Sequence, residues 1–496
     1  MKTVSNYLKN PLFYLLLILI IGFTLRLYKI DNPVADWHSW RQADTAAVAR
    51  NFYDEGYNPF FPRGDDMSLI SELKRVPNLE RYRFVEFPIY PSLVALTYFL
   101  NQGVDEELAR LVSIIFSLGS AVFLYLIVKR YSSTAHALLS SFVFLTLPFG
   151  IYFSRVILPE PSLVFFSLGM FYFLDRWIFE NKKSLMLWGI FFTACAFLTK
   201  PMAVFFLLPL GYSYYLKEGF KFPPKRYFLF FIPALIPFIL WRFWIANFPE
   251  GIPASGWLLN GNGIRFRPAF FRWIIGDRMG REILSIAGGA LFFLGLIVKP
   301  LNKTNYLLHL LTLSSFAYLL VFATGNVQHD YYQYLLMPAL SIFLARGVWL
   351  LFQGIPLFLP RIITIPLAIF LILITYYLTW NEIKGLYQVN NWSIVKAGQK
   401  ADEILPKDAI VVAPYQGDSA FLYQINRNGF SFVIMSVEEM MRLYDTNYYV
   451  STSKDTKTAW LMNKYKTLIE DPEYIIIDLK NRNPNFVDLG ETEPSN

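Results

Sequence analysis

The sequence predicts an α-helical polytopic membrane protein with about eleven transmembrane helices and a small C-terminal α/β domain. Two observations lead to this fold class. Apolar residues make up 55% of the 496 residues and charged residues only 17%, whereas a soluble chain of this length carries more charge. Apolar runs of about 16–21 residues also recur along the chain, close to the length that crosses a bilayer as a helix.

The apolar runs give the expected spans, and the basic residues between them set the expected orientation. The spans cover 11–30, 108–128, 134–152, 162–178, 185–199, 201–216, 227–246, 283–298, 304–323, 334–352 and 359–379. The basic loops all fall on the side of the N-terminus if that end is cytoplasmic. They comprise Lys2 with Lys9, 129–130, 176–183, 217–226 and 299–303. Such loops account for the net charge of +8 without a nucleic-acid partner.

The expected domain boundary lies near residue 380. Residues 1–380 form the transmembrane domain, with a large first external loop at 31–107, and 381–496 form an extracytoplasmic α/β domain. Within the loop, the apolar segment 88–101 is expected to be an interfacial helix. The alternative for this segment is a further span, which would invert the next few loops.

The tail 381–496 is polar, and its apolar runs are too short to span a membrane. Expected strands at 409–413, 430–435, 448–451 and 474–479 alternate with expected helices at 437–444 and 457–468. Because this tail is expected on the same side as the polar loops, we expect it to influence which acceptor molecule reacts at a site formed by those loops.

The densest polar group follows directly on the first span, at residues 36–45. If a helix starts near Trp40, Arg41 and Asp44 share one of its faces. An external aspartate can deprotonate an acceptor hydroxyl or amine, while Arg41 and His38 can hold a phosphate. The alternative is an interfacial belt, in which the two tryptophans anchor the segment and its charges are solvated.

Further polar motifs are expected on the same side. Glu86 and Glu160, each beside a proline at a membrane boundary, suit a divalent cation site together with a histidine, or are helix-terminal acids favoured by the dipole. Lys200 breaks the positive-inside trend, which indicates an anionic ligand or a snorkelling side chain. His329 and Tyr332 can line a sugar or phosphate pocket, or serve as interfacial aromatics.

These polar residues gather at one face of an apolar bundle, which suits a lipid-linked phosphate substrate with its tail in the bilayer. The alternatives are a transporter or flippase for lipid-linked sugars, and a non-catalytic membrane assembly protein. Acids in mid-span and paired repeats are typical of transport, and the sequence offers neither convincingly. It also lacks a Gly-rich phosphate loop, so no nucleotide cofactor is expected. The single cysteine, Cys195, excludes a disulfide within the chain.

A series of short motifs carries a resemblance to a known family. They read HSWRQADTA and ARNF at 38–46 and 49–52, EFPIYP at 86–91, RVILPEP at 155–161, LTKP at 198–201 and HDYY at 329–332. Their order resembles that of the GT-C membrane glycosyltransferases, in the branch of protein O-mannosyltransferases and the bacterial lipid A aminoarabinose transferase. The likeness is greatest to bacterial dolichyl-phosphate-mannose-protein mannosyltransferase family proteins.

The resemblance implies a GT-C fold and an inverting transfer from a polyprenyl-phosphate sugar on the external face. The acceptor would be a glycan, a lipid or a protein. The base would be a first-loop aspartate, for which Asp44 matches best and Asp36 second. Glu160 matches the family's second acidic position, and Glu86 matches an acid implicated in metal or substrate binding. Metal-dependent and metal-independent members both occur, so a divalent cation remains open, with Glu86 and Glu160 as its candidate ligands.

The chain departs from the aminoarabinose transferase at Phe87, where that enzyme has a lysine. Its phosphate contact must therefore come from another cation. An alignment on Ala49-Arg50 also puts Arg41 at the aspartate position, which leaves both aspartates as candidate bases. The candidate substrate-binding residues are His38, Arg41, Glu86, Arg155, Glu160, Lys200, Arg265 with Arg267, His329 and Tyr332. The loop style favours a bacterial inner membrane.

Overall fold

The computed structural model describes residues 10–222, 225–300, 302–354, 359–486 and 493–494. The chain forms two compact units. The first comprises Met1–Ile30, Arg110–Phe243 and Ser255–Leu386, and the second Asp31–Ala109, Trp244–Ala254 and Tyr387–Asn496. The expected first loop and the expected tail thus belong to one unit. Lys2 and Lys9, which entered the expected orientation, lie outside the described residues.

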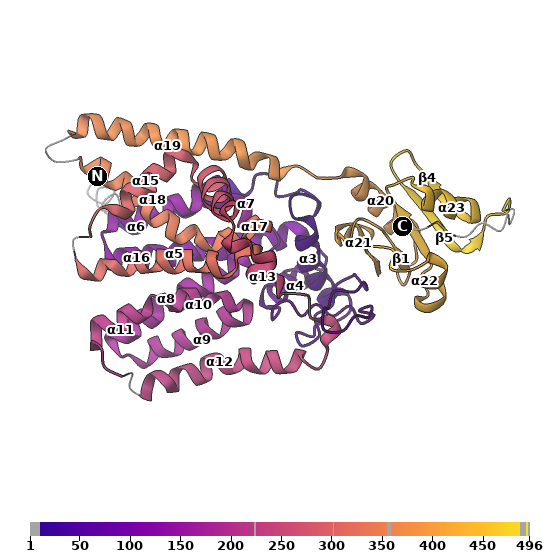
Figure 1. Ribbon diagram of the computed structural model, residues 1–496, viewed down its shortest axis with the longest axis horizontal. Helices are drawn as coiled ribbons and strands as arrows, with labels where there is room; N and C mark the ends of the chain where they lie inside the picture. The colour runs from indigo at the N-terminus through magenta and orange to yellow at the C-terminus, as the bar shows by residue number, and fades with distance from the viewer. Residues whose placement is uncertain (1–9, 223–224, 301, 355–358, 487–492, 495–496) are drawn as a thin grey trace. The chain divides into compact units, whose positions relative to one another are not determined.

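The first unit is built of helices (Figure 1). They are α2 (Pro11–Arg26), α5 (Glu106–Tyr131), α6 (Thr134–Thr146), α7 (Pro148–Phe153), α8 (Glu160–Glu180), α9 (Lys183–Thr199), η1 (Pro201–Ala203), α10 (Val204–Leu207), α11 (Leu210–Glu218), α12 (Lys225–Ile245), α13 (Trp257–Asn260), η3 (Gly261–Phe266), α14 (Pro268–Phe271), η4 (Arg272–Ile283), α15 (Ser285–Ile297), η5 (Lys303–Asn305), α16 (Tyr306–Val321), α17 (Ala323–Gln328), η6 (Asp330–Leu336), α18 (Met337–Gln353), α19 (Arg361–Ile383) and η7 (Lys384–Tyr387).

Among the described residues, 6 helices are long and apolar enough to cross a membrane, and the bent pair 268–283 and 285–297 raises the number to 7. The shorter apolar helices α2, α6 and α9 account for three more of the expected spans. The expected span 201–216 is instead broken into η1, α10 and α11. Pro201 and Pro209 explain the breaks, because proline lacks the N–H that continues a helix.

Glycines let two helices of the first unit approach closely. A Cβ on Gly295 of α15 would overlap the carbonyl oxygen of Phe343, and a Cβ on Gly347 of α18 would overlap that of Leu291. Small residues at such a contact bring the two backbones together, as is common between helices in membranes. Substitution of either glycine would force α15 and α18 apart.

The second unit combines helices with one sheet (Figure 1). Its elements are α3 (Ser39–Asp54), α4 (Ile89–Asn101), η2 (Pro249–Gly251), α20 (Trp392–Ile404), β1 (Ile410–Val412), α21 (Ala420–Ile425), β2 (Asn428–Phe430), α22 (Val437–Tyr444), β3 (Tyr448–Ser451), α23 (Thr456–Lys464), β4 (Tyr465–Glu470) and β5 (Ile475–Arg482). The strand order is β2-β1-β3-β5-β4. β1 pairs in parallel with β2 and β3, whereas β5 pairs antiparallel with β3 and β4.

The expected small α/β domain is therefore confirmed, with two local errors. The strand expected at 430–435 is β2, which covers Asn428–Phe430 instead. The helix expected at 457–468 ends at Lys464, and β4 follows directly. Thr467 and Ile469 favour a strand because they are β-branched, and both pair with β5. The segment 88–101 contains helix α4 and belongs to the second unit.

The expected first loop adds its own backbone to this sheet. Met67 donates its amide hydrogen to the carbonyl of Gly429 at 2.7 Å, and Gly429 donates to the carbonyl of Asp65 at 3.0 Å. The side chain of Met67 lies in the same apolar cluster as Val412 and Phe430 of the tail. Residues 65–67 thus extend the edge of the sheet at β2, and the loop and tail share one core.

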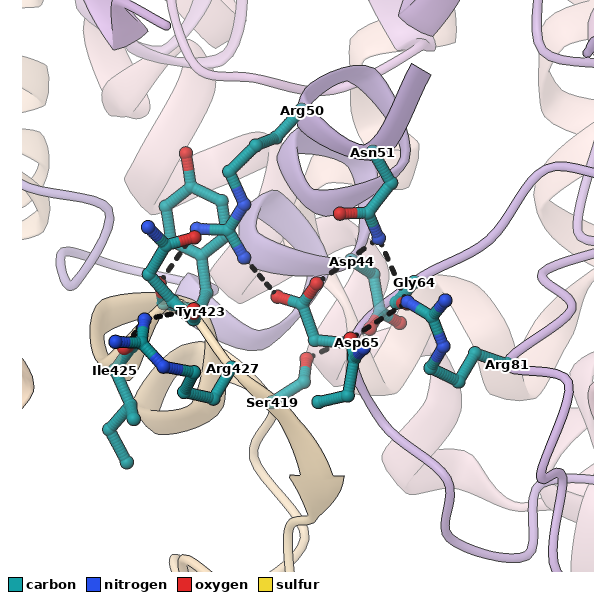
Figure 2. A network of polar contacts seen from close by, with 12 residues as sticks. Asp44, Arg50, Asn51, Gly64, Asp65, Arg81, Ser419, Tyr423, Ile425 and Arg427 are labelled. Carbon is teal, nitrogen blue, oxygen red and sulfur yellow. Dashed lines mark hydrogen bonds and ion pairs between the residues drawn. The ribbon is translucent and has the colours of Figure 1, made fainter. Parts of the chain in front are cut away.

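A buried polar network further joins α3 to the tail, as Figure 2 shows. Arg50 donates to Asp65 Oδ2 at 2.5 Å and to the carbonyl of Tyr423 at 2.9 Å, and its guanidinium lies 4.3 Å from the centre of the Tyr423 ring. Asn51 donates to Asp65 Oδ1 at 3.2 Å and to the carbonyl of Gly64 at 3.0 Å. These bonds fix the rotation of α3, and with it the direction of its polar face.

Candidate functional site

The N-terminal half of α3 lines a cleft in the second unit. The helix begins at Ser39, directly after His38, whose backbone is left-handed with φ 56°. The cleft has an empty volume of about 290 Å³, part of it open to solvent. It is lined by Arg41, Asp44, Thr45, Val48, Pro62, Arg83, Val85, Glu86, Pro88 and Pro91. The expected helix start and the expected shared face of Arg41 and Asp44 are therefore both confirmed.

Arg41 and Glu86 form an ion pair in this cleft. Arg41 Nη2 donates to the two carboxylate oxygens of Glu86 at 2.7 and 3.0 Å, and both side chains are more than nine-tenths buried. Arg41 Nη1 also lies 3.3 Å from the Thr45 hydroxyl. Because each charge is matched, the pair holds the segment that carries Glu86, just before α4, against α3.

Asp44 has two oxygens in different surroundings. Its Oδ1 accepts a hydrogen bond from Arg83 Nη2 at 3.0 Å and another from the Ser419 hydroxyl at 2.8 Å. In the part of the chain that the structure describes, no donor contacts Oδ2. The side chain is 12% exposed and lies at the cleft. Asp44 is thus a fixed carboxylate with one oxygen available to a ligand.

Asp36 lies in a different environment, although it is only eight residues away. Its side chain is fully buried, and Oδ1 accepts from Gln42 Nε2 at 2.5 Å. Its backbone carbonyl accepts from the Asn390 side chain at 2.9 Å. His38 is half-buried, with its ring 5.2 Å from that of Trp37. Neither Asp36 nor His38 lines the cleft.

Residues 418–419 of the tail complete the surroundings of Asp44. The Ser39 hydroxyl donates to Asp418 Oδ2 at 3.1 Å, and the Ala420 amide donates to Asp418 Oδ1 at 2.7 Å. Burial raises the pKa of Asp418 to about 6, and the charge of Asp44 adds to the rise, while these two hydrogen bonds oppose it. Asp418 therefore titrates near neutral pH.

Sequence reasoning did not find Arg83, Asp418 or Ser419. A signal for the last two exists, because they follow β1, and loops at the carboxyl ends of parallel strands are where α/β sheets bind ligands. Arg83 lies in the irregular segment before Glu86, where the sequence shows no helical or strand periodicity that would assign the residue to a face.

The first unit contains a second group of expected residues. Lys200 forms an ion pair with Glu160, and its ammonium lies 5.2 Å from the centre of the Tyr332 ring and 6.0 Å from that of Tyr331. Lys200 is 7% exposed and Glu160 is fully buried. Glu160 Oε2 has no hydrogen-bond partner among the described residues. The lysine is thus a desolvated cation between a carboxylate and aromatic faces.

His329 packs among aromatic rings of the same unit. Its ring stacks on Tyr331 with centroids 5.5 Å apart and meets the Trp257 ring at 5.5 Å. The next residue, Asp330, lies 3.6 Å from Arg278 Nη1. The expected pocket at this tip is therefore a well-packed aromatic cluster beside an ion pair.

The other expected arginines hold backbone carbonyls. Arg155 is fully buried and donates to the carbonyl of Lys29. Arg265 donates to the carbonyls of Leu259 and Val321 at 3.1 and 2.7 Å, and Arg267 donates to the carbonyl of Asn262 at 2.8 Å. In this arrangement these side chains brace the loops that carry them.

Among the described residues, no group of three or more His, Cys, Asp or Glu side chains could hold a metal ion. The candidate ligand Glu86 binds the guanidinium of Arg41, and the candidate ligand Glu160 binds the ammonium of Lys200. A divalent cation would therefore have to compete with a buried cation at either glutamate.

Comparisons with known proteins agree with this architecture. The family model described as dolichyl-phosphate-mannose-protein mannosyltransferase matches residues 87–244. A protein of Aquifex aeolicus (strain VF5), described as uncharacterized, is 30% identical over 298 residues, which are 54% of this chain and 67% of that protein.

Solved structures share the fold at low sequence identity. The crystal structure of ArnT from Cupriavidus metallidurans bound to undecaprenyl phosphate matches with a TM-score of 0.64 at 12% identity, covering 93% of this chain and 97% of ArnT. The apo oligosaccharyltransferase of Archaeoglobus fulgidus matches with a TM-score of 0.57 at 11% identity, covering 92% of this chain and 73% of that one. The archaeal AglB in complex with an inhibitory peptide and a dolichol-phosphate matches with a TM-score of 0.51 at 12% identity, covering 92% and 72%. With its apolar helices and these neighbours, the chain is an integral membrane protein with the GT-C fold. It belongs to the same family as the Aquifex aeolicus protein, and its residues 87–244 match the mannosyltransferase family model.

Proposed function

We propose that this protein moves a sugar from a polyprenyl-phosphate donor to a hydroxyl or amine acceptor, with inversion at the anomeric carbon. The GT-C fold and the family-model match over residues 87–244 support a glycosyltransferase. The donor class is supported by the undecaprenyl phosphate bound to ArnT and the dolichol-phosphate bound to AglB, two structural neighbours. For the acceptor we propose a glycan, a lipid or a protein, and the acceptor peptide tethered to the Archaeoglobus fulgidus oligosaccharyltransferase supports a protein.

The observation that carries this proposal is the state of Asp44. Arg83 and Ser419 hold Oδ1, Oδ2 has no donor among the described residues, and Asp44 lines the cleft. A general base must be held in place and within reach of the proton it removes. Asp44 meets these conditions better than Asp36, whose carboxylate is fully buried.

The proposed step balances as follows. The acceptor oxygen or nitrogen attacks C1 of the sugar and gives its proton to Asp44 Oδ2. The bond from C1 to the phosphate oxygen breaks, and polyprenyl phosphate leaves with the electron pair. The proton then passes from Asp44 to solvent. Attack from the face opposite the leaving group inverts the configuration at C1.

We assign the phosphate contact to a cation, with Lys200 as the first candidate and Arg41 as the second. The Lys200 ammonium is desolvated, so its attraction to a phosphate is little screened. Glu160 and Tyr332 hold this ammonium in place, which is the role we propose for both. Arg41 is the second candidate because its guanidinium binds both carboxylate oxygens of Glu86, whereas Lys200 binds one oxygen of Glu160.

We further propose that transfer takes place on the extracytoplasmic face of a bacterial inner membrane. The basic pairs 129–130 and 182–183 lie at one end of α5 and between α8 and α9, as positive-inside loops do. Alkaline phosphatase fused after residue 486 should then be active in a bacterial host, and β-galactosidase fused at the same position should be inactive. The reverse pattern would contradict this orientation.

The test of the proposed function uses the purified protein in detergent with radiolabelled undecaprenyl-phosphate mannose and undecaprenyl-phosphate aminoarabinose. Transfer is followed to envelope lipids, glycans and proteins, and to water as a minimal acceptor. We expect the enzyme to release label from one of the two donors, with or without EDTA, because Glu86 and Glu160 already pair with buried cations. Loss of activity in EDTA would restore Glu86 and Glu160 as candidate metal ligands. Binding of both donors without transfer or hydrolysis would favour the transporter or assembly protein.

A further inference from the structure

Two serine–aspartate hydrogen bonds join the start of α3 to residues 418–419 in opposite directions. Ser39 of α3 donates to Asp418, and Ser419 donates to Asp44 of α3. The four residues all belong to the second unit. In the sequence, 375 residues separate Asp44 from Ser419. The bonds therefore bring two distant parts of the chain to one carboxylate.

The Ser419 hydroxyl has a choice of two acceptors. It lies 2.8 Å from Asp44 Oδ1 and 3.1 Å from the carbonyl of Trp40. A hydroxyl has one proton to donate, and the ionised carboxylate at the shorter distance is the stronger acceptor. Ser419 is 7% exposed, so water competes poorly for this bond.

With Arg83, this hydroxyl saturates one oxygen of the carboxylate. Oδ1 receives both donors, and Oδ2 receives none from the described residues. The carboxylate can therefore not rotate to exchange its oxygens without losing two charge-assisted hydrogen bonds. The asymmetry leaves Oδ2 as the oxygen on which a substrate proton can be received.

We propose that Ser419 is a positioning residue for glycosyl transfer: its hydroxyl, supplied by the C-terminal domain, holds Asp44 so that Oδ2 faces the acceptor. This inference rests on the proposed function, in which Asp44 is the base. It gives the C-terminal domain a part in the chemical step, beyond an influence on acceptor choice. Residues 418–419 are then a part of the site that the transmembrane helices do not supply.

The groups around Asp44 come from several parts of the second unit. Arg83 is the cation at 3.0 Å, and the same guanidinium lies 3.7 Å from Asp66 Oδ2. Asp418 lies beside Ser419 in the tail, and the matched pair of Arg41 and Glu86 lines the same cleft. Removal of the Ser419 hydroxyl would leave Arg83 as the one donor to Asp44 Oδ1 among the described residues. The carboxylate would then be held less firmly in the orientation that transfer requires.

The experiment compares Ser419→Ala, Ser419→Thr and Ser451→Ala with the full-length wild type, using the donor hydrolysis and transfer assay above. Ser451 is the matched control, because it is a buried serine of the same unit whose hydroxyl bonds locally to the carbonyl of Ser453. We expect Ser419→Ala to lower kcat about tenfold with little change in KM for the donor. Ser419→Thr keeps the hydroxyl and should restore most of kcat.

Other outcomes overturn the inference in distinguishable ways. Equal losses in Ser419→Ala and Ser451→Ala, with equal drops in melting temperature, would make Ser419 merely structural. A wild-type kcat in Ser419→Ala, while Asp44→Asn abolishes transfer, would remove the inference and leave the proposed function intact. Full activity in Asp44→Asn would overturn both.

Discussion

Arg83 Nη2 donates to Asp44 Oδ1 at 3.0 Å, across the cleft that α3 lines. The pair is nearly buried, with side-chain exposures of 7% and 12%. Arg83 also lies 3.7 Å from Asp66, whose carboxylate accepts from the hydroxyl of Ser431 in the tail at 2.9 Å. Arg83 thus holds the candidate base, Asp44, and Asp66 in turn holds Arg83 close to the edge of the sheet.

Replacement of Arg83 by Gln should lower kcat by about 10–100-fold, because a charge-assisted hydrogen bond to the base is lost. The matched control is Arg63→Gln, since Arg63 forms surface ion pairs with Glu55 and Glu80 and is 38% exposed. Initial rates of donor turnover measure the effect. A loss in Arg63→Gln as large as that in Arg83→Gln would argue against a specific role.

The Arg50–Asp65 pair should be important for stability rather than for chemistry. Asp65→Ala leaves the buried Arg50 charge without its carboxylate, which costs about 3–5 kcal/mol. Burial opposes the charged form of Arg50, but the attraction of Asp65 raises its pKa, so the arginine stays ionised. Glu473→Ala, which removes the partner of the half-exposed Lys396, should cost about 0–1 kcal/mol. Thermal unfolding of the two variants tests this ordering, and similar melting temperatures would contradict it.

Asp418 should make the protein less stable as pH rises from about 4 to about 6. Its folded pKa of about 6 lies above the ordinary value near 3.8, so the native state binds more protons in that window. The stabilisation that protonated Asp418 contributes is present below the ordinary pKa and is lost as pH rises through the folded pKa. It is on the order of 3 kcal/mol, since the two pKa values differ by about 2 and each pKa unit is worth about 1.4 kcal/mol.

Asp418→Asn should flatten this dependence, because asparagine cannot titrate. Melting temperature measured at half-unit steps between pH 4 and 7 gives the comparison. Identical slopes in the wild type and in Asp418→Asn would show that Asp418 is not the group responsible.

Lys200→Met should weaken donor binding, because methionine keeps the apolar volume of the side chain and removes its charge. We expect the Kd for undecaprenyl phosphate to rise about tenfold or more. Lys182→Met is the control, since Lys182 is 64% exposed and pairs with Glu180 at the surface. An unchanged Kd in Lys200→Met would move the phosphate contact to Arg41.

Local sequence patterns predicted several helices and strands, and most membrane spans. Helix α22 begins and ends at the expected residues, and β3 also covers its expected range. Apolar length predicted most spans, but it did not reveal that Pro201 and Pro209 interrupt one of them. The expected helix at 457–468 failed because the pairing of β4 with β5, a tertiary interaction, overrode helix propensity.

The candidate site was predictable only in part, because half of it is non-local. Arg41 and Asp44 share a helical face, so their proximity follows from spacing alone. The approach of Ser419 to Asp44 depends on how the tail packs on residues 65–67, which no short-range pattern encodes. Asp36 and Asp44 both remained candidates from the sequence, and the structure separates them by burial and by their hydrogen-bond partners.

The most direct test of the account is the rate of donor turnover in Asp44→Asn compared with Asp36→Asn, each with donor binding measured on the same preparation. The account predicts that Asp44→Asn binds undecaprenyl-phosphate sugar normally and turns it over about 100–10,000-fold more slowly. Asp36→Asn should retain most of the rate and lose melting temperature instead. Normal turnover in Asp44→Asn, with loss in Asp36→Asn, would contradict the assignment of the base.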